Sequence, residues 1–186
     1  HGANFFNDLL PLPYTRATLE QVVNHIDEVQ NTLQRTILLE NPSTYLDFST
    51  HEMGEAEFIS EIIRRSGCGL LLDINNIYVS ATNQGFSANG FLDALPVEAI
   101  GQIHLAGHSA DQDEAGNCLL IDSHNQPVAQ PVWELYDVAI EKFGATPTLI
   151  EWDDDLPEFT RLQAEARAAE QRLRVARDKE HYRVAS

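Results

Sequence analysis

The sequence predicts an α/β domain built from parallel strands and the helices that cover them. Four short apolar runs, residues 36–39, 69–72, 102–105 and 148–150, show no alternation of apolar and polar residues. Such runs are typical of parallel strands that are covered on both faces. Helical segments separate them, and the strand–helix–strand unit recurs every ~30–45 residues, as in an α/β barrel or a doubly wound sheet.

The helices are predicted from apolar residues that recur at helical spacing. The first spans residues 18–33, and its apolar face contains Leu19, Val22, Val23, Ile26, Val29 and Leu33. The second spans residues 55–65 and stops at Gly67. A loop containing residues 83–85 leads to a short helix near Phe91, a further helix spans 131–143, and a charged, Ala-rich helix spans 156–183.

The number of strands indicates part of a barrel. A closed (β/α)8 barrel needs eight strands and typically ~250 residues, whereas this chain has 186 residues and four strand candidates. We therefore expect residues 1–186 to form a single domain that supplies about the C-terminal half of a barrel, with the N-terminal strands missing.

Composition restricts the partners. The formal net charge of −17 argues against binding to a phosphate backbone or a membrane surface. No apolar run approaches the ~20 residues that span a bilayer, and no signal peptide is visible. Cys68 and Cys118 are too few for a disulfide framework, which predicts reduced thiols in a cytoplasmic protein.

Each predicted strand carries a potential metal ligand at or near its carboxyl end. The strand residues are Glu40, Asp73, His104 and Glu151. Three further potential ligands lie in the adjoining loops: Asn76, Asp122 and His124. The carboxyl ends of barrel strands converge on one active site. Seven oxygen and nitrogen donors exceed what one zinc or iron ion binds, and imidazole with carboxylate but no thiolate suits Fe, Zn or Mn. His108, four residues after His104, is the candidate catalytic residue.

Each of these residues also has a simpler interpretation. An acidic residue after a strand is often a helix cap or lies in a solvated loop, His104 fits a core histidine, and residues 122–124 fit a turn. The recurrence of such a residue on four successive strands favours a shared site. Cys68, by contrast, is interpreted as a buried thiol with a packing role.

Several longer motifs resemble the multinuclear non-haem iron-dependent oxidase family, long catalogued as a family of unknown function. They lie at residues 7–15 (NDLLPLPYT), 39–41 (LEN), 67–76 (GCGLLLDINN), 103–108 (IHLAGH), 121–124 (IDSH) and 149–153 (LIEWD). The resemblance extends to about residue 175 and implies a TIM barrel related to xylose isomerase and endonuclease IV. It also implies two or three iron ions that oxidise cysteine residues of a ribosomally made precursor peptide with O2, and a small partner protein that presents the peptide.

The resemblance assigns roles to the ligands. Glu40 would bridge two metals, Asp73, His104 and Glu151 would complete the middle site, and Asn76, Asp122 and His124 would hold a further metal. The family takes two more histidines from early strands, and neither is in this chain; His1 is not counted as a ligand. Two alternatives stay open: a metal-dependent hydrolase or isomerase on the same scaffold, and a non-catalytic fragment.

Overall fold

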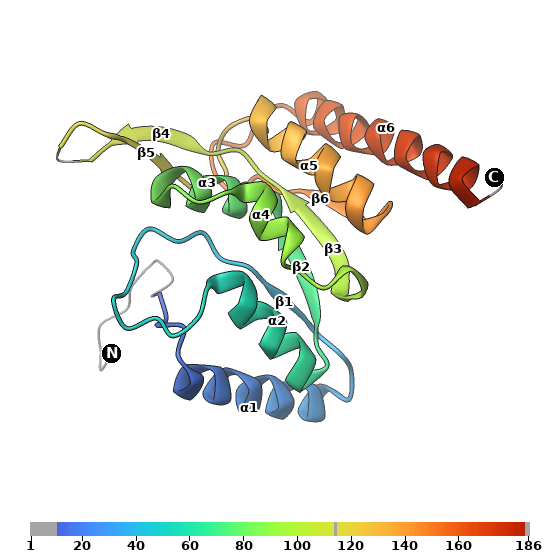
Figure 1. Cartoon of the computed structure of the whole chain (residues 1–186). Helices are drawn as coiled ribbons and strands as arrows, with labels where there is room; N and C mark the ends of the chain where they lie inside the picture. The colour runs from blue at the N-terminus through green and yellow to red at the C-terminus, as the bar shows by residue number, and fades with distance from the viewer. Residues whose placement is uncertain (1–10, 114, 185–186) are drawn as a thin grey trace.

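Four parallel strands form the central sheet. The computed structural model describes residues 11–113 and 115–184, so His1 and the start of the 7–15 motif lie outside the described residues. The sheet order is β1-β2-β3-β6, with bounds β1 Leu38–Glu40, β2 Gly69–Asp73, β3 Ile100–Leu105 and β6 Thr148–Ile150. The order follows the chain, and helices separate the strands, which confirms the predicted parallel α/β class (Figure 1).

The helices lie around the sheet and bury its apolar side chains. They are α1 Arg16–Leu33, α2 Glu55–Ser66, α3 Ile74–Gln84, α4 Ala88–Asp93, α5 Gln130–Phe143 and α6 Phe159–Val184, with a short 3-10 helix η1 at Val97–Ala99. Leu70, Leu72, Ile103 and Leu105 are completely buried. Among the described helices, none combines the length and the apolar composition that crossing a membrane requires.

One helix and one hairpin were not predicted. Helix α3 begins directly at the end of β2, where the Asp73 side chain accepts the backbone N–H of Asn76, and it ends at Gly85 (φ 75°). The loop predicted at residues 83–85 is wrong in its start, because Asn83 and Gln84 lie in the last turn of this helix. Asparagines have low helix propensity, which weakens the helical pattern of the segment. The antiparallel hairpin of β4 Ser109–Gln112 and β5 Cys118–Ile121 projects from the body of the molecule (Figure 1).

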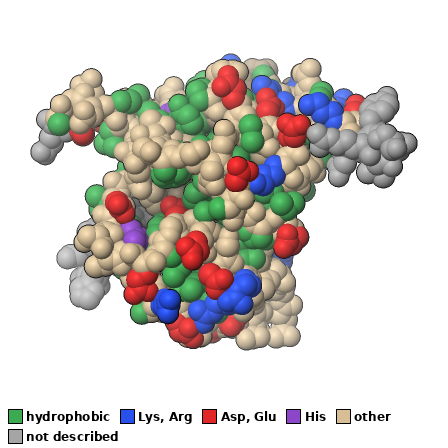
Figure 2. All heavy atoms as spheres, in the orientation of Figure 1, with side chains coloured by type: hydrophobic (Ala, Val, Ile, Leu, Met, Phe, Trp, Pro, Cys, Tyr) green, Lys and Arg blue, Asp and Glu red, His purple; other side chains and the backbone are tan. Residues whose placement is uncertain are grey.

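Two helices differ from prediction in detail. Val29 and Leu33 are 43% and 54% exposed, because α1 packs mainly on α2 through Leu19, Val23 and Ile26. The last helix begins at Phe159, not at residue 156, because Leu156 precedes a proline and is thereby disfavoured from helical conformation. On the face seen in Figure 2, acidic side chains are scattered over the surface with basic ones among them.

Candidate metal centre

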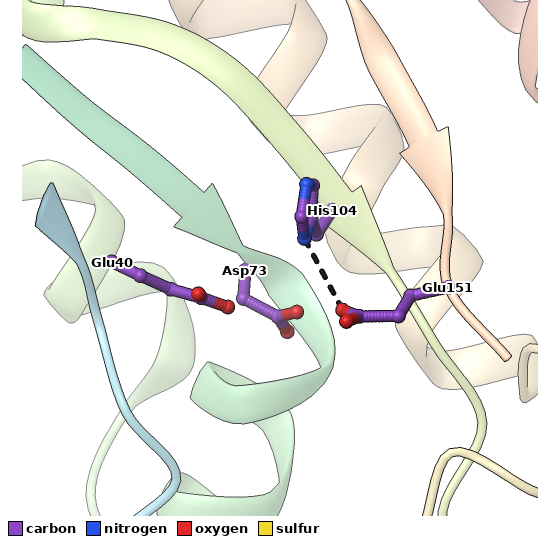
Figure 3. Close-up of side chains that lie close together, drawn as sticks. All are labelled: Glu40, Asp73, His104 and Glu151. Carbon is purple, nitrogen blue, oxygen red and sulfur yellow. Dashed lines mark hydrogen bonds and ion pairs between the residues drawn. The ribbon is translucent and has the colours of Figure 1, made fainter. Parts of the chain in front are cut away.

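The four predicted strand-end donors converge. Glu40 and Asp73 are the last residues of β1 and β2, His104 is the penultimate residue of β3, and Glu151 directly follows β6. Each offers a ligand atom, and these atoms all lie within 4.8 Å of one another. The side chains point toward one another from neighbouring strands (Figure 3), and His104 Nδ1 lies 3.2 Å from Glu151 Oε2. Parallel pairing produces this cluster, because Asp73 and His104 are register partners on β2 and β3.

The cluster concentrates negative charge around the completely buried carboxyl of Asp73, while Glu40 reaches it from the exposed edge of the sheet. Complete burial raises the pKa of the Asp73 carboxyl well above its usual range; the Asn76 N–H lowers it, while the Asp122 and Glu40 charges raise it further. Burial likewise raises the pKa of Glu40, with His104 opposing and Glu151 adding to the effect. A bound cation would relieve both the desolvation and the mutual repulsion.

Asp73 has two functions in this arrangement. Its Oδ1 accepts the backbone N–H of Asn76 at 2.7 Å and caps α3, as the simpler interpretation of a strand-end acid expects. Its Oδ2 is buried and finds no hydrogen-bond partner among the residues that the structure describes, and the same is true of Asn76 Oδ1. Buried oxygens without partners are costly and rare. Capping therefore uses one carboxylate oxygen of Asp73 and leaves the other available to bind a metal ion.

A second group lies beside the first. His124 Nε2 is 2.8 Å from Asp122 Oδ1, and His124 Nδ1 is 3.1 Å from Asp153 Oδ2 and 3.7 Å from Glu151 Oε2. Burial alone would lower the pKa of His124, but the Asp122 hydrogen bond and the charges of Asp122, Asp73 and Glu151 raise it to about 9. Glu151 connects the two groups, because His124, Glu151 and Asp153 also form a set of close potential ligands.

Asp122 and His124 lie in a loop that follows β5. His124 has a left-handed backbone (φ 47°) in this loop. A bond from the His124 N–H to the carbonyl of Gly107 (3.0 Å) holds this loop against the end of β3.

The sequence-based prediction missed the residues that hold the ligands in place. Asn41 pairs reciprocally with the backbone of Asp73: Asn41 Nδ2 donates to the Asp73 carbonyl and the Asp73 N–H donates to Asn41 Oδ1, both at 2.9 Å. Asn76 Nδ2 donates to the Asn41 carbonyl. Tyr45 Oη accepts the Asp122 N–H at 2.8 Å. Asn41 and Asp153 belong to the sequence motifs at residues 39–41 and 149–153, but their contacts are with residues far away in the sequence.

His108 lies beside the second group and outside both sets of close potential ligands. Its Nδ1 is 2.8 Å from Asn75 Oδ1, and its ring lies against that of Tyr78, with centroids 5.2 Å apart. Burial lowers the pKa of His108, although the Asp122 charge opposes this. The imidazole is therefore neutral near pH 7 and able to accept a proton.

The donors fit a hard or borderline metal. They are carboxylate oxygens, an amide oxygen and imidazole nitrogens, and neither cysteine joins them, since Cys68 is buried in the hydrophobic core and Cys118 is exposed on the hairpin. Metal–ligand bonds of ~2.0–2.2 Å place two ligands of one ion at most ~4.4 Å apart. The ligand atoms of the four residues lie within 4.8 Å of one another, so a movement of at most ~0.4 Å would bring every pair inside that limit.

A comparison with protein families identifies the family to which the chain belongs. The profile described as "RiPP precursor modification enzyme MbnB/TglH/ChrH" matches residues 1–174. The chain belongs to the MbnB/TglH/ChrH family. This confirms the resemblance drawn from the sequence motifs.

Two curated relatives of this MbnB/TglH/ChrH member are UPF0276 proteins. A UPF0276 protein from Paraburkholderia phytofirmans is 55% identical over 169 residues, which is 91% of this chain and 55% of that protein. One from Rhizobium meliloti is 55% identical over 170 residues, again 91% and 55% of the two chains. The chain thus spans about half the length of the curated relatives it matches.

Solved structures identify the fold. A xylose isomerase-like TIM barrel protein from Mycobacterium smegmatis, in complex with magnesium, aligns with a TM-score of 0.53 at 15% identity, over 90% of this chain and 53% of that one. A xylose isomerase domain containing protein from Salmonella typhimurium aligns with a TM-score of 0.51 at 15% identity, over 88% and 61%. The four-stranded sheet therefore corresponds to about half of a TIM barrel, as predicted.

Proposed function

We propose that the protein is a multinuclear iron-dependent oxidase that uses O2 to modify cysteine residues of a ribosomally made precursor peptide. The observation that carries the proposal is the convergence of Glu40, Asp73, His104 and Glu151 at the carboxyl ends of four parallel strands, in a chain that belongs to a family of RiPP precursor modification enzymes. Iron supplies binding of the substrate thiolate and activation of O2.

The ligands divide into two sets. Glu40, Asp73, His104 and Glu151 would hold one ion, and the free Oδ2 of Asp73 suits this role. Asn76, Asp122 and His124 would hold another, with Asn76 contributing its unpartnered Oδ1. Glu40 lies on the edge strand β1 and would bridge to a further ion. Zinc or manganese would suit the same donors in protein as isolated.

The surrounding residues have supporting roles. Asn41 fixes the backbone of Asp73, and Tyr45 fixes that of Asp122, so the two carboxylates keep their relative placement. His108 is the proposed catalytic residue, because its neutral imidazole can take a proton from the substrate. Ligands from outside this chain would complete a third metal position.

The proposed partners follow from the same function. They are a Cys-containing precursor peptide and a small protein that presents it, in the cytoplasm, with no role for nucleic acid or a membrane. The net charge of −17 supports the exclusion of nucleic acid.

Oxygen consumption tests the proposal. The intact protein is loaded with Fe(II) and mixed with a peptide from the nearest short reading frame that encodes cysteines. We expect O2 uptake and a mass change at cysteine, both lost in His104→Ala and kept in His25→Ala, whose side chain is exposed on α1. A redox-silent protein that contains zinc or magnesium and consumes no O2 would instead support a hydrolase or isomerase.

A further inference from the structure

The side chain of Asn75 connects two functional groups. Asn75 lies in the first turn of α3 and is completely buried. Its Nδ2 donates to Asp122 Oδ1 at 2.6 Å, and its Oδ1 is 2.8 Å from His108 Nδ1. Asn75 is in neither ligand set, so its buried amide needs a different explanation.

The chemistry of the partners fixes the orientation of this amide. An ionised carboxylate only accepts hydrogen bonds, so the group that faces Asp122 is the NH₂ of Asn75. The other end of the amide, which faces His108, is then the carbonyl oxygen, which also only accepts. His108 Nδ1 must therefore carry a hydrogen and donate it.

Tyr78 packs against the His108 ring, and the Nε2 atom of that ring stays free of hydrogen bonds within the described residues. Tyr78, one turn after Asn75 on α3, lies against the imidazole at 5.2 Å with an interplanar angle of 32°. Within residues 11–113 and 115–184, no hydrogen bond reaches His108 Nε2. A neutral imidazole has one N–H, so a hydrogen on Nδ1 leaves the lone pair on Nε2.

We propose that Asn75 is a positioning residue that holds His108 in the Nδ1–H tautomer and so makes Nε2 the atom that accepts a proton from the substrate. Asp122 orients the amide, and the amide orients the imidazole. Proton uptake at Nε2 gives an imidazolium that keeps its Nδ1–H bond to Asn75. The catalytic consequence rests on the proposed function, whereas the tautomer does not.

The tautomer is measurable without activity. Long-range ¹H–¹⁵N NMR of the metal-free, intact protein, labelled at histidine nitrogen, reports which ring nitrogen of His108 carries the hydrogen; spectra are recorded near pH ~8, above the ordinary histidine pKa. A His108→Gln sample identifies the signals among the histidines. We expect Nδ1–H in the parent protein and a shift toward Nε2–H, the form that free histidine prefers, in Asn75→Leu.

Asn83→Leu is the matched control. Asn83 lies on the same helix and also makes two hydrogen bonds, with the N–H and carbonyl of Leu120, both at 2.9 Å, but it does not contact His108. We expect the His108 tautomer to stay unchanged in this variant. An Nε2–H tautomer in the parent overturns the proposal, and so does an unchanged tautomer in folded Asn75→Leu. The parent spectrum decides the question if Asn75→Leu does not fold.

Turnover distinguishes positioning from general support. With saturating metal, we expect Asn75→Leu to lower kcat by about 10–100-fold, as loss of an outer-shell partner typically does. In the His108→Ala background, the same substitution should cause no further loss, because its effect passes through His108. If the kcat losses of Asn75→Leu and His108→Ala multiply in the double variant, Asn75 does not act through His108. If no peptide is oxidised at all, the proposed function fails while the tautomer result still stands.

Discussion

Glu55 gives a prediction about pH and stability that does not depend on metal. This residue begins α2, and burial raises its pKa from 4.5 to about 7, although a hydrogen bond from Tyr14 lowers it. Because the pKa of this carboxyl is higher in the folded state, the folded protein binds more protons than the unfolded protein between pH 4.5 and about 7. Stability from Glu55 is therefore fully present below pH ~4.5 and is lost as pH rises toward ~7.

The size of this effect follows from the two pKa values. The change from 4.5 to about 7 corresponds to ~3.4 kcal/mol at ~1.36 kcal/mol per pKa unit. The amino end of α2 favours the ionised form by ~0.3–1 kcal/mol, which reduces the loss. We expect the protein to lose roughly 2–3 kcal/mol of unfolding free energy through Glu55 alone.

Urea unfolding of the parent and Glu55→Gln at pH ~4 and pH ~8 isolates this contribution, because other carboxylates titrate in both proteins. Relative to the parent, Glu55→Gln should gain ~2–3 kcal/mol on going from the lower to the higher pH. Glu57→Gln, an exposed residue in the same helical turn, should show no such gain. An equal parent–variant difference at both pH values would refute the reasoning.

Three further predictions concern the site and the sheet edges. In Gly107→Ala, the new Cβ would lie 1.9 Å from the carbonyl oxygen of Gln126, so we expect a loss of at least ~1–3 kcal/mol in urea unfolding. In His124→Ala, bound iron per chain should fall, and unchanged stoichiometry by elemental analysis would remove His124 from the site. Residues 1–186 alone should associate in light scattering, because edge strands β1 and β6 expose Leu38 (39%) and Leu149 (42%). A monodisperse, cooperatively folding monomer would contradict that expectation.

The strand-end donors could be predicted because two simple patterns coincide. Continuous apolar runs locate buried parallel strands, and parallel strands bring their carboxyl ends together. Glu40, Asp73, His104 and Glu151 were therefore placed in one cluster without knowledge of any contact, and the structure confirms that they lie together. Their coordination of metal stays a prediction.

The supporting network could not be predicted, because it depends on tertiary contacts. The hydrogen bond between Asn75 and Asp122 joins residues 47 positions apart, and that between Tyr45 and Asp122 joins residues 77 apart. Asp73 is at once the last residue of β2, the cap of helix α3 and a candidate ligand. A pattern that assigns each residue a single role cannot represent such a double function.

The location of iron tests the central claim most directly. Anomalous diffraction at the iron absorption edge, from crystals of the intact Fe(II)-loaded protein, shows where the metal binds. We predict a peak with carboxylate and imidazole atoms of Glu40, Asp73, His104 and Glu151 at ~2.0–2.2 Å, and a second beside Asp122 and His124. An iron-loaded crystal with no peak among the four strand-end residues would contradict the account.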